Sequence, residues 1–350
     1  MDLKKFVKAA ELEVIGLDVG SSSVKIVQLK QNNGAFKVVA AGKADIENTN
    51  GGSGHSQNVQ AVKAVVECFK KSGVQSRFAV CGVSGPEVAV RDFKFPVLPM
   101  EEIAGAVQLE AEQVCPFNVA ESVVDYQLLP NGKESIRGVL VAATNKLVRR
   151  KEKLVKEAAL SPVLIDIDGL ALSNCLETCE GYESGKATAI MNVGNSYTTL
   201  VIVGEGSIPF VRDTSHAGSS ITRKIAEQTQ MSVEKVSRAM FSEQGDSQQS
   251  ALLESCMEAA CDPLIDDITG TIRYYTAQKK SYYVDKVLVC GGFARARGFV
   301  DILDRRLPAH AVLWNPLEKI ESETSDTVKS FLQENGYEMA VAAGLAMRSV

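Results

Sequence analysis

The sequence predicts an α/β protein with two related domains and a smaller α+β block inserted into the first. A pattern of strand, polar residue, Val-Gly, polar turn and second strand occurs at Asp18 and again at Asn192. Such a repeat indicates a duplicated domain. A further strand ends in Gly291-Gly292. Residues 91–161 interrupt the first copy of the domain with a pattern of strands and helices that does not belong to the repeat. These three observations predict a duplicated domain with an insertion rather than one domain built on a single sheet.

The composition excludes several classes of protein. Of the 350 residues, 45% are hydrophobic and 23% charged, and the net charge of −5 argues against a partner that is nucleic acid. No apolar run reaches the roughly 18 residues of a membrane-spanning helix. The eight cysteines form no Cys-x-x-Cys pair and are expected as buried thiols in a reducing cytosol. Apolar residues within the first ten, with Lys4, Lys5 and Lys8 beside them, favour a short docking or frayed helix over a membrane-surface helix.

Hydrophobic periodicity predicts the elements of the first domain. Asn33-Gly34 is typical of a two-residue hairpin turn between two strands, and Gly73 is expected to end a helix. The elements expected in order are strands at 14–18, 24–30 and 36–45, a helix at 59–71 and a buried strand at 77–83.

The block at 91–161 is predicted to be α+β. It begins with extended chain at "FKFPVLP" and continues with an amphipathic helix that Pro116 ends. The elements that follow are strands at 122–129 and 135–145 and a helix at 146–160, after which a strand at 163–168 and a helix at 169–179 return to the first domain.

The second domain is expected to begin with three strands between Ala187 and Asp213. A helical region then runs from Ser219 to about Lys280, and Pro263 should bend or break its longest helix. The expected domains are 12–90 with 162–185 and 320–350, the insertion 91–161, and 186–319 with a helical subdomain at about 218–283. A strand, Gly291-Gly292 and a helix follow, and residues 337–349 close the chain as a helix rich in small residues.

The two turns suggest a phosphate site. Consecutive backbone N–H groups in a tight glycine turn form a concavity that binds anions. Ser21, Ser22 and Ser23 add hydroxyl donors, Lys25 adds a positive charge, and Asp18 is placed to hold a hydrated Mg²⁺. Two such turns face to face would clamp a polyphosphate; the alternative is two ordinary hairpins.

Gly291-Gly292 permits close approach of a flat ring or a sugar. Neither GxxxxGK[ST] nor GxGxxG occurs in the chain, which excludes a P-loop enzyme and a protein kinase.

Five motifs in order, "GLDVGSSSVK", "LIDIDGLALSN", "MNVGNSYTTL", "VCGGFARARGF" and "YEMAVAAGLAM", resemble those of the actin/Hsp70/sugar-kinase superfamily. The resemblance implies actin-like duplicated ribonuclease-H-type domains, and the insertion is similar to that of the cell-division protein FtsA. "LPMEEIAGAVQLEAEQVCPF" and "DIDGLALSN" resemble the PilM family of type IV pilus assembly proteins.

The resemblance implies roles for particular residues. Asp168 corresponds to the residue that orients the attacking water, and Gly218 to a residue brought near the phosphates. The residues implied to bind ATP or ADP are Asp18, Gly20, Ser21, Ser22, Ser23 and Lys25 in the first turn, Asn192, Gly194, Asn195, Ser196 and Thr198 in the second, and Gly218, Glu234, Lys235, Gly291, Gly292 and Phe293 elsewhere.

Two positions depart from the superfamily pattern. Asn192 replaces the usual aspartate, which removes a charge that would help hold Mg²⁺ and water for hydrolysis. Ala217 replaces a usual glycine. We therefore expect nucleotide binding to survive and hydrolysis to be slow or absent, so that enzymatic activity is left open.

The PilM resemblance implies a cytoplasmic scaffold, peripheral to the inner membrane through its partners. It implies that the short N-terminal peptide of a PilN-like protein docks beside the insertion, with other pilus platform proteins and motor ATPases as further partners; self-association is left open. The alternatives are an FtsA-like division protein, a type II secretion platform protein or a small-molecule kinase of the superfamily.

Overall fold

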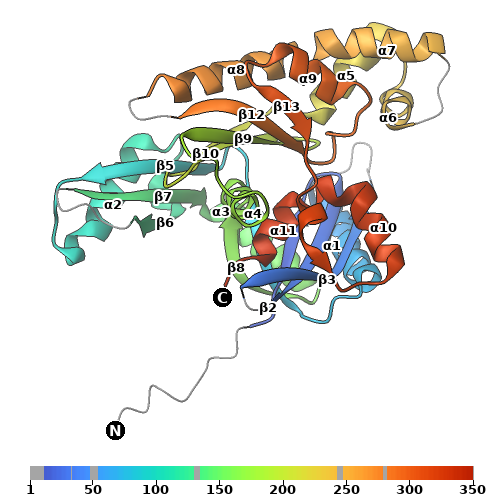
Figure 1. Ribbon diagram of the computed structural model, residues 1–350. Coiled ribbons are helices and arrows are strands. Elements are labelled where there is room, and N and C mark those ends of the chain that lie inside the picture. The colour runs from blue at the N-terminus through green and yellow to red at the C-terminus, as the bar shows by residue number, and fades with distance from the viewer. Residues whose placement is uncertain are drawn as a thin grey trace.

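The computed structural model describes residues 12–32, 34–47, 54–129, 135–242, 247–278 and 282–349. The expected N-terminal helix and Asn33 lie outside these residues. Three β-sheets organise the described chain, and Figure 1 shows two larger sheets with helices between them and a small sheet to one side.

The first sheet has the strand order β14-β3-β2-β1-β4-β8. The hairpin prediction is confirmed, because Asn32 pairs with Ala35 and Gly34 has a φ of 84°. The strands are β1 (Ile15–Val19), β2 (Ser23–Asn32), β3 (Ala35–Asp45), β4 (Phe78–Val83), β8 (Ser161–Ile167) and β14 (Glu321–Ser322).

The second sheet repeats this topology, with the order β11-β10-β9-β12-β13. In each sheet an antiparallel meander of three strands is followed by two parallel strands. The strands are β9 (Lys186–Val193), β10 (Thr198–Gly204), β11 (Phe210–Thr214), β12 (Tyr283–Cys290) and β13 (His310–Leu313). The shared topology confirms the duplicated, actin-like fold class.

Two helices lie between the larger sheets (Figure 1). They are α4 (Asp168–Cys179) and α11 (Ala340–Ala346), whose buried residues share one core with Ile190 and Val201 of the second sheet. Glycine allows their close crossing: a Cβ on Gly344 would lie 1.9 Å from the carbonyl oxygen of Ala171. Backbone therefore meets backbone where the two domains join.

Helices cover the outer faces of both sheets. On the first sheet, α1 (Gly54–Ser72) and α3 (Asn145–Glu157) share a core with β1 and β4. The second sheet carries α5 (Gly218–Thr229), α6 (Val233–Phe241), α7 (Ser247–Ala260), α8 (Asp262–Thr276) and α9 (Phe299–Arg306). Pro263 stands in the first turn of α8, so the predicted break occurs between α7 and α8.

The small sheet has the order β5-β7-β6, formed by β5 (Val88–Phe95), β6 (Ser122–Leu128) and β7 (Ile136–Thr144). Helix α2 (Met100–Val114) covers it, and its Ile103 and Val107 are buried against Phe93 and Leu140. The apolar face of α2 thus packs on its own sheet. Helix α3 instead buries Leu154 and Val155 in the core of the first sheet.

The chain after Gly291-Gly292 differs from the expectation. Turns occupy 291–298, and α9 begins only at Phe299, after Gly298 with a φ of 74°. Short elements near the C-terminus, β13, β14 and α10 (Asp326–Asn335), had no strong periodic signal because each is short or half-exposed.

Candidate functional site: two facing turns

The two repeated turns have the same internal geometry. The N–H of Gly20 donates to the carbonyl of Ser23 at 3.1 Å, and that of Gly194 donates to Tyr197 at 3.0 Å. A Cβ on Gly194 would lie 2.8 Å from the Tyr197 carbonyl oxygen, so the turn is tight enough to need glycine.

The turns face each other across the junction of the domains. Asn195 Nδ2 donates to Ser21 Oγ at 3.2 Å, and Ser196 Oγ donates to the same oxygen at 2.8 Å. Ser21 and Ser22 are exposed, whereas Ser23 is buried. The structure therefore brings the polar tips of the two predicted turns together.

Strand register sets two rows of side chains at the ends of the sheets that carry the two turns. In the first sheet Asp18 pairs with Lys25, which pairs with Lys43. In the second sheet Asn192 pairs with Thr199, and Thr199 pairs with Asp213. In the second row, therefore, β9 carries an amide and β11 carries the carboxylate.

Lys25 is the central cation of the first row. It is buried, and its Nζ lies 3.3 Å from Asp18 Oδ2. Burial alone would lower the pKa of its ammonium, but the charges of Asp18, Glu338 and Asp168 outweigh burial and raise that pKa. Lys25 therefore stays charged.

Asp168 is the first residue of α4, and its Oδ2 accepts a 2.6 Å hydrogen bond from Ser84 Oγ. Its Oδ1 is buried and has no hydrogen-bond partner among the described residues. Loss of solvation and the nearby charge of Asp18 raise the pKa of this carboxyl to about 7. The group can thus hold or release a proton near neutral pH.

Replacing Asp168 by asparagine is expected to raise the free energy of unfolding of the ligand-free protein near pH 8 by about 1–3 kcal/mol. The folded pKa of about 7 exceeds the ordinary 3.8. Below about pH 4 the Asp168 carboxyl is protonated in both the folded and the unfolded state, so it does not alter stability. Between about pH 4 and pH 7 it ionises more readily in the unfolded state, and the folded state is increasingly destabilised. Asparagine does not ionise and can still accept from Ser84.

Urea unfolding at pH 5 and pH 8 checks this expectation. The matched control is Asp92→Asn, the same change at an exposed strand position, which should leave the pH dependence unaltered. Equal stability of wild type and Asp168→Asn at pH 8 would contradict the assignment.

The loop after β12 approaches the second turn. Gly291 has a φ of 93° and a Cβ there would lie 2.6 Å from the carbonyl oxygen of Val193. The Phe293 N–H donates to that same carbonyl at 3.0 Å, and the Phe293 ring is buried against Phe299. Phe293 therefore fixes the loop through its buried ring, and Gly292 presents half-exposed backbone.

Gly218 begins α5 beside the second turn. Its N–H donates to Gly194 O at 3.0 Å, and the N–H of Ser219 donates to Asn195 O at 2.8 Å. The hydroxyl of Thr198 donates to the carbonyl of His216 at 2.8 Å. These groups therefore hold the turn in place and already have partners.

Glu234 and Lys235 lie on the exposed first turn of α6, where Ser232 accepts from the Lys235 N–H at 3.3 Å. Within the described chain, neither side chain forms a hydrogen bond or ion pair with the turns. The structure thus brings together the two turns, Asp168, Gly218 and the glycine loop, while these two side chains stay apart.

Three charged residues of the cleft were missed by sequence reasoning. They are Lys43, Glu338 and Asp213. Lys43 Nζ lies 2.7 Å from Glu338 Oε2, and Asp213 Oδ1 accepts from Thr199 Oγ1 at 2.5 Å. Glu338 stood within a quoted motif, whereas Lys43 and Asp213 could be found only through strand pairing.

The oxygen donors of the cleft suit a hydrated divalent cation. Asp18 and Asp168 supply carboxylates, and the Asp168 Oδ1 atom lacks a partner in the described chain, whereas the Asn192 amide oxygen accepts from the Cys290 thiol at 3.9 Å. Mg²⁺ prefers such oxygen ligands and keeps several waters. These residues therefore fit a cation that accompanies phosphates.

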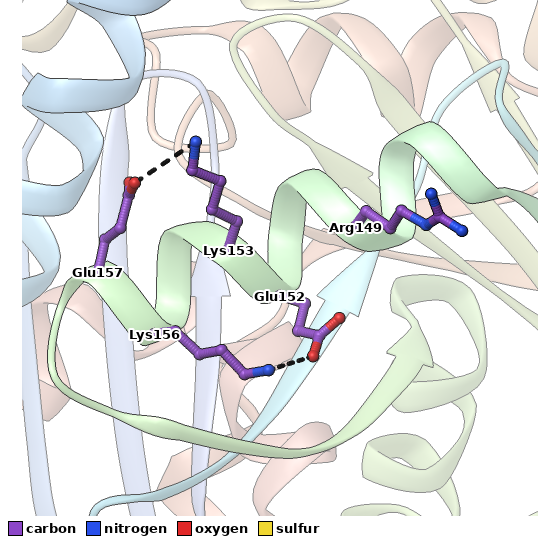
Figure 2. Close-up of a pocket in the computed structure, with 5 residues that line it drawn as sticks. All are labelled: Arg149, Glu152, Lys153, Lys156 and Glu157. Atoms are coloured by element: carbon purple, nitrogen blue, oxygen red, sulfur yellow. Dashed lines mark hydrogen bonds and ion pairs between the residues drawn. The ribbon is translucent and has the colours of Figure 1, made fainter.

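A separate hollow of about 420 Å³ lies on the outer face of α3. Figure 2 shows that its lining side chains are charged, with Lys156 paired to Glu152 and Lys153 paired to Glu157. These pairs are typical of a solvated helix surface, and none of the lining residues belongs to the two turns.

Comparison with solved structures supports the actin-like fold. The chain matches a chain of the PilM-PilN type IV pilus biogenesis complex with a TM-score of 0.81 and 23% identity, covering 97% of this chain and 98% of that one. It matches the ethanolamine utilization protein EutJ from Carboxydothermus hydrogenoformans with a TM-score of 0.56 and 13% identity, covering 95% and 88%. At these identities the likeness shows the fold.

A family model described as type IV pilus assembly protein PilM matches residues 16–350. The chain therefore belongs to the PilM family of type IV pilus assembly proteins. Because this match covers nearly the whole chain, the division-protein, type II secretion and kinase alternatives are not favoured.

More distant relatives are cell-division proteins. The chain is 22% identical to FtsA of Enterococcus faecalis over 237 residues, which are 61% of this chain and 53% of that protein. It is 20% identical to FtsA of Bacillus subtilis (strain 168) over 251 residues, 64% of this chain and 56% of that protein. The chain spans about half the length of these curated relatives. Within the described residues, no helix combines the length and apolarity needed to cross a membrane.

Proposed function

We propose that this protein is a cytoplasmic ATP-binding scaffold of the type IV pilus inner-membrane platform, and that it recruits the N-terminal tail of a PilN-like membrane protein. The observation that carries the nucleotide part is the contact of the two turns at Ser21, with the charged Lys25 behind them. Other platform proteins would hold the scaffold at the membrane.

In this proposal the cleft holds ATP or ADP with Mg²⁺. Lys25 and the turn N–H groups would bind the phosphates, and the backbone at Gly292 would lie against the adenosine. Asp18 would hold the cation through water, as hard oxygen ligands do. The bound ion would neutralise phosphate charge beside the carboxylates.

Replacing Asn192 by aspartate is expected to raise ATP turnover by about tenfold or more. The wild-type Asn192 amide carries no charge, so it would hold a cation and its water less strongly than an aspartate carboxylate. Phosphate release at saturating ATP measures the effect, with Asn118→Asp, the same change at an exposed position of the inserted block, as the matched control. Brisk wild-type turnover that Asp168→Ala leaves unchanged would contradict the roles of both residues.

The partner peptide is proposed to dock on the inserted block. The buried face of α2 is already used, so an extended peptide needs another surface. Strand β6 lies at one edge of the small sheet. Side chains of Val97, Met100, Leu109 and Val123 are exposed on this block, with exposed fractions of 66%, 71%, 62% and 47%. They offer apolar contacts on the same block as this edge.

The edge of β6 has defined hydrogen-bonding groups. The Leu129 N–H donates to β7 at the Arg137 carbonyl, so alternation directs the N–H of Tyr126 away from β7. That N–H donates instead to Asp125 Oδ1 at 2.8 Å. An added strand would replace this local bond. The exposed glutamates of α2 at 101, 102 and 112 give an acidic surround that suits a basic tail.

A synthetic N-terminal peptide of the PilN-like protein from the same organism tests the docking. Fluorescence anisotropy should show binding to the full chain. Methylating alternate peptide nitrogens should abolish binding in one register and spare the other if β6 accepts a strand; equal effects in both registers favour apolar pockets instead. Crosslinks that lie wholly beyond Ala187 would refute docking on the inserted block.

A further inference from the structure

Lys151 of α3 extends to the base of the first turn. Leu154 and Val155, one helical turn later, are buried in the core of the first sheet, so Lys151 starts from the same face of the helix. Its Nζ donates to the carbonyl of Val19 at 3.2 Å. Val19 is the last residue of β1 and directly precedes Gly20 of the turn. A second cation, from another element than Lys25, therefore stands beside the proposed phosphate site.

Lys151 differs from the other cations around it on α3. Lys153 and Lys156 pair with glutamates of the same helix, on the outer face drawn in Figure 2, and Arg150 lies 3.6 Å from Glu87. Lys151 is half-buried, and within the described chain its hydrogen bond goes to a neutral carbonyl and it forms no ion pair. An ammonium has three donors. Its charge and its remaining donors are thus available to an anionic ligand.

The charged groups of the site follow one another from the glycine loop to Lys151. Glu338 Oε2 lies 3.7 Å from the position of a Cβ on Gly292. Burial lowers the pKa of Lys25, and the charges of Glu338 and Asp168 raise it, so Lys25 lies within reach of both carboxylates. Burial raises the pKa of Asp168, and the charge of Lys151 opposes that rise. Lys151 therefore stands at the Asp168 end of the site, and Gly292 stands at the Glu338 end.

We propose that Lys151 binds the terminal phosphate of ATP and lets the site distinguish ATP from ADP. The inference rests on the proposed function, in which adenosine lies against Gly292 and Lys25 binds phosphates. A polyphosphate that begins at Gly292 and passes Lys25 ends beside Asp168 and Lys151, so the longer chain of ATP reaches Lys151 and that of ADP stops short. The flexible stem of a lysine lets its ammonium turn from the Val19 carbonyl to a phosphate oxygen.

Calorimetry on the full chain tests the proposal with Mg²⁺-ADP and with Mg²⁺ and the non-hydrolysable analogue β,γ-imido-ATP. Lys151→Met should weaken binding of the analogue by about tenfold or more, as loss of a charge-assisted contact does, and change ADP binding by less than about threefold. Retained ADP binding also shows that the variant is folded. Lys151→Arg should keep much of the preference for the analogue, because it keeps the charge.

The matched control is Lys153→Met, which removes an exposed lysine of the same helix that pairs with Glu157 and should alter neither affinity. Equal weakening of both nucleotides by Lys151→Met, or no weakening of either, overturns the terminal-phosphate role while sparing the proposed function. Absence of binding of both nucleotides to folded wild type overturns the proposed function itself.

Lysine acetylation of wild type gives a second test that needs no variant. After brief treatment with acetic anhydride, mass spectrometry measures the modification of each lysine. Mg²⁺ with β,γ-imido-ATP should protect Lys151 more than Mg²⁺-ADP does, whereas Lys153 should react equally with either nucleotide present. Equal modification of Lys151 in the two complexes contradicts the proposal.

Discussion

Replacing Lys25 by methionine is expected to lower the affinity for Mg²⁺-ATP by about a hundredfold, as loss of a buried charge-assisted contact should. Lys25 is buried, lies 3.3 Å from Asp18, and is the cation paired in register between Asp18 and Lys43. Methionine keeps much of the volume and removes the charge. Calorimetry with Mg²⁺-ATP measures the loss directly.

The same change is expected to lower the free energy of unfolding by about 3 kcal/mol, because it leaves Asp18 beside Asp168 without its cation. Lys30→Met, at an exposed position of the same strand, is the matched control and should alter neither quantity. Unchanged ATP affinity in a folded Lys25→Met protein would remove the phosphate role of Lys25. Absence of ATP and ADP binding to folded wild type would defeat the nucleotide proposal.

Replacing Gly344 by alanine is expected to lower the free energy of unfolding by about 3 kcal/mol or more. The added Cβ would lie 1.9 Å from the Ala171 carbonyl oxygen, so α11 and α4 would have to separate. A backbone carbonyl cannot rotate aside as a side chain can. Urea unfolding followed by circular dichroism measures the change.

Gly105→Ala in α2 is the matched control, since nothing lies within 4 Å of its Cβ position. It removes a flexible residue from an exposed helix and should stabilise by up to about 1 kcal/mol. Equal effects of the two substitutions would show that the helix crossing tolerates more volume than its geometry indicates.

Much of the fold could be predicted because its signals are local or repeated. The hairpin at Asn32 and Ala35 follows from two turn residues, and the break before α8 follows from Pro263. The short β13 and β14 lacked enough alternating residues to be distinguished from loop. Their pairing depends on strands far away in the chain.

The candidate site likewise contains residues with a local sequence signal and residues that only tertiary structure brings to the site. The two turns carried their own signal in a glycine among polar residues, and the structure places their tips in contact. Asp213 and Lys43 carry no such sequence signal, because an acid or a lysine in a strand usually faces solvent. Only register with Thr199 and Lys25 brings them to the cleft. The buried ring of Phe293 likewise depends on Phe299 and Phe241 around it.

The bond between Asp125 and the Tyr126 N–H has a consequence for how the protein behaves at high concentration in a cell. Open strand edges promote aggregation, because any extended segment can pair with them. Here two copies approaching through β6 would each bring a carboxylate to the contact, and each would have to break a local bond first. If the proposed docking holds, a basic peptide would meet attraction where a second copy would meet repulsion. Asp125 would then make the edge selective without closing it.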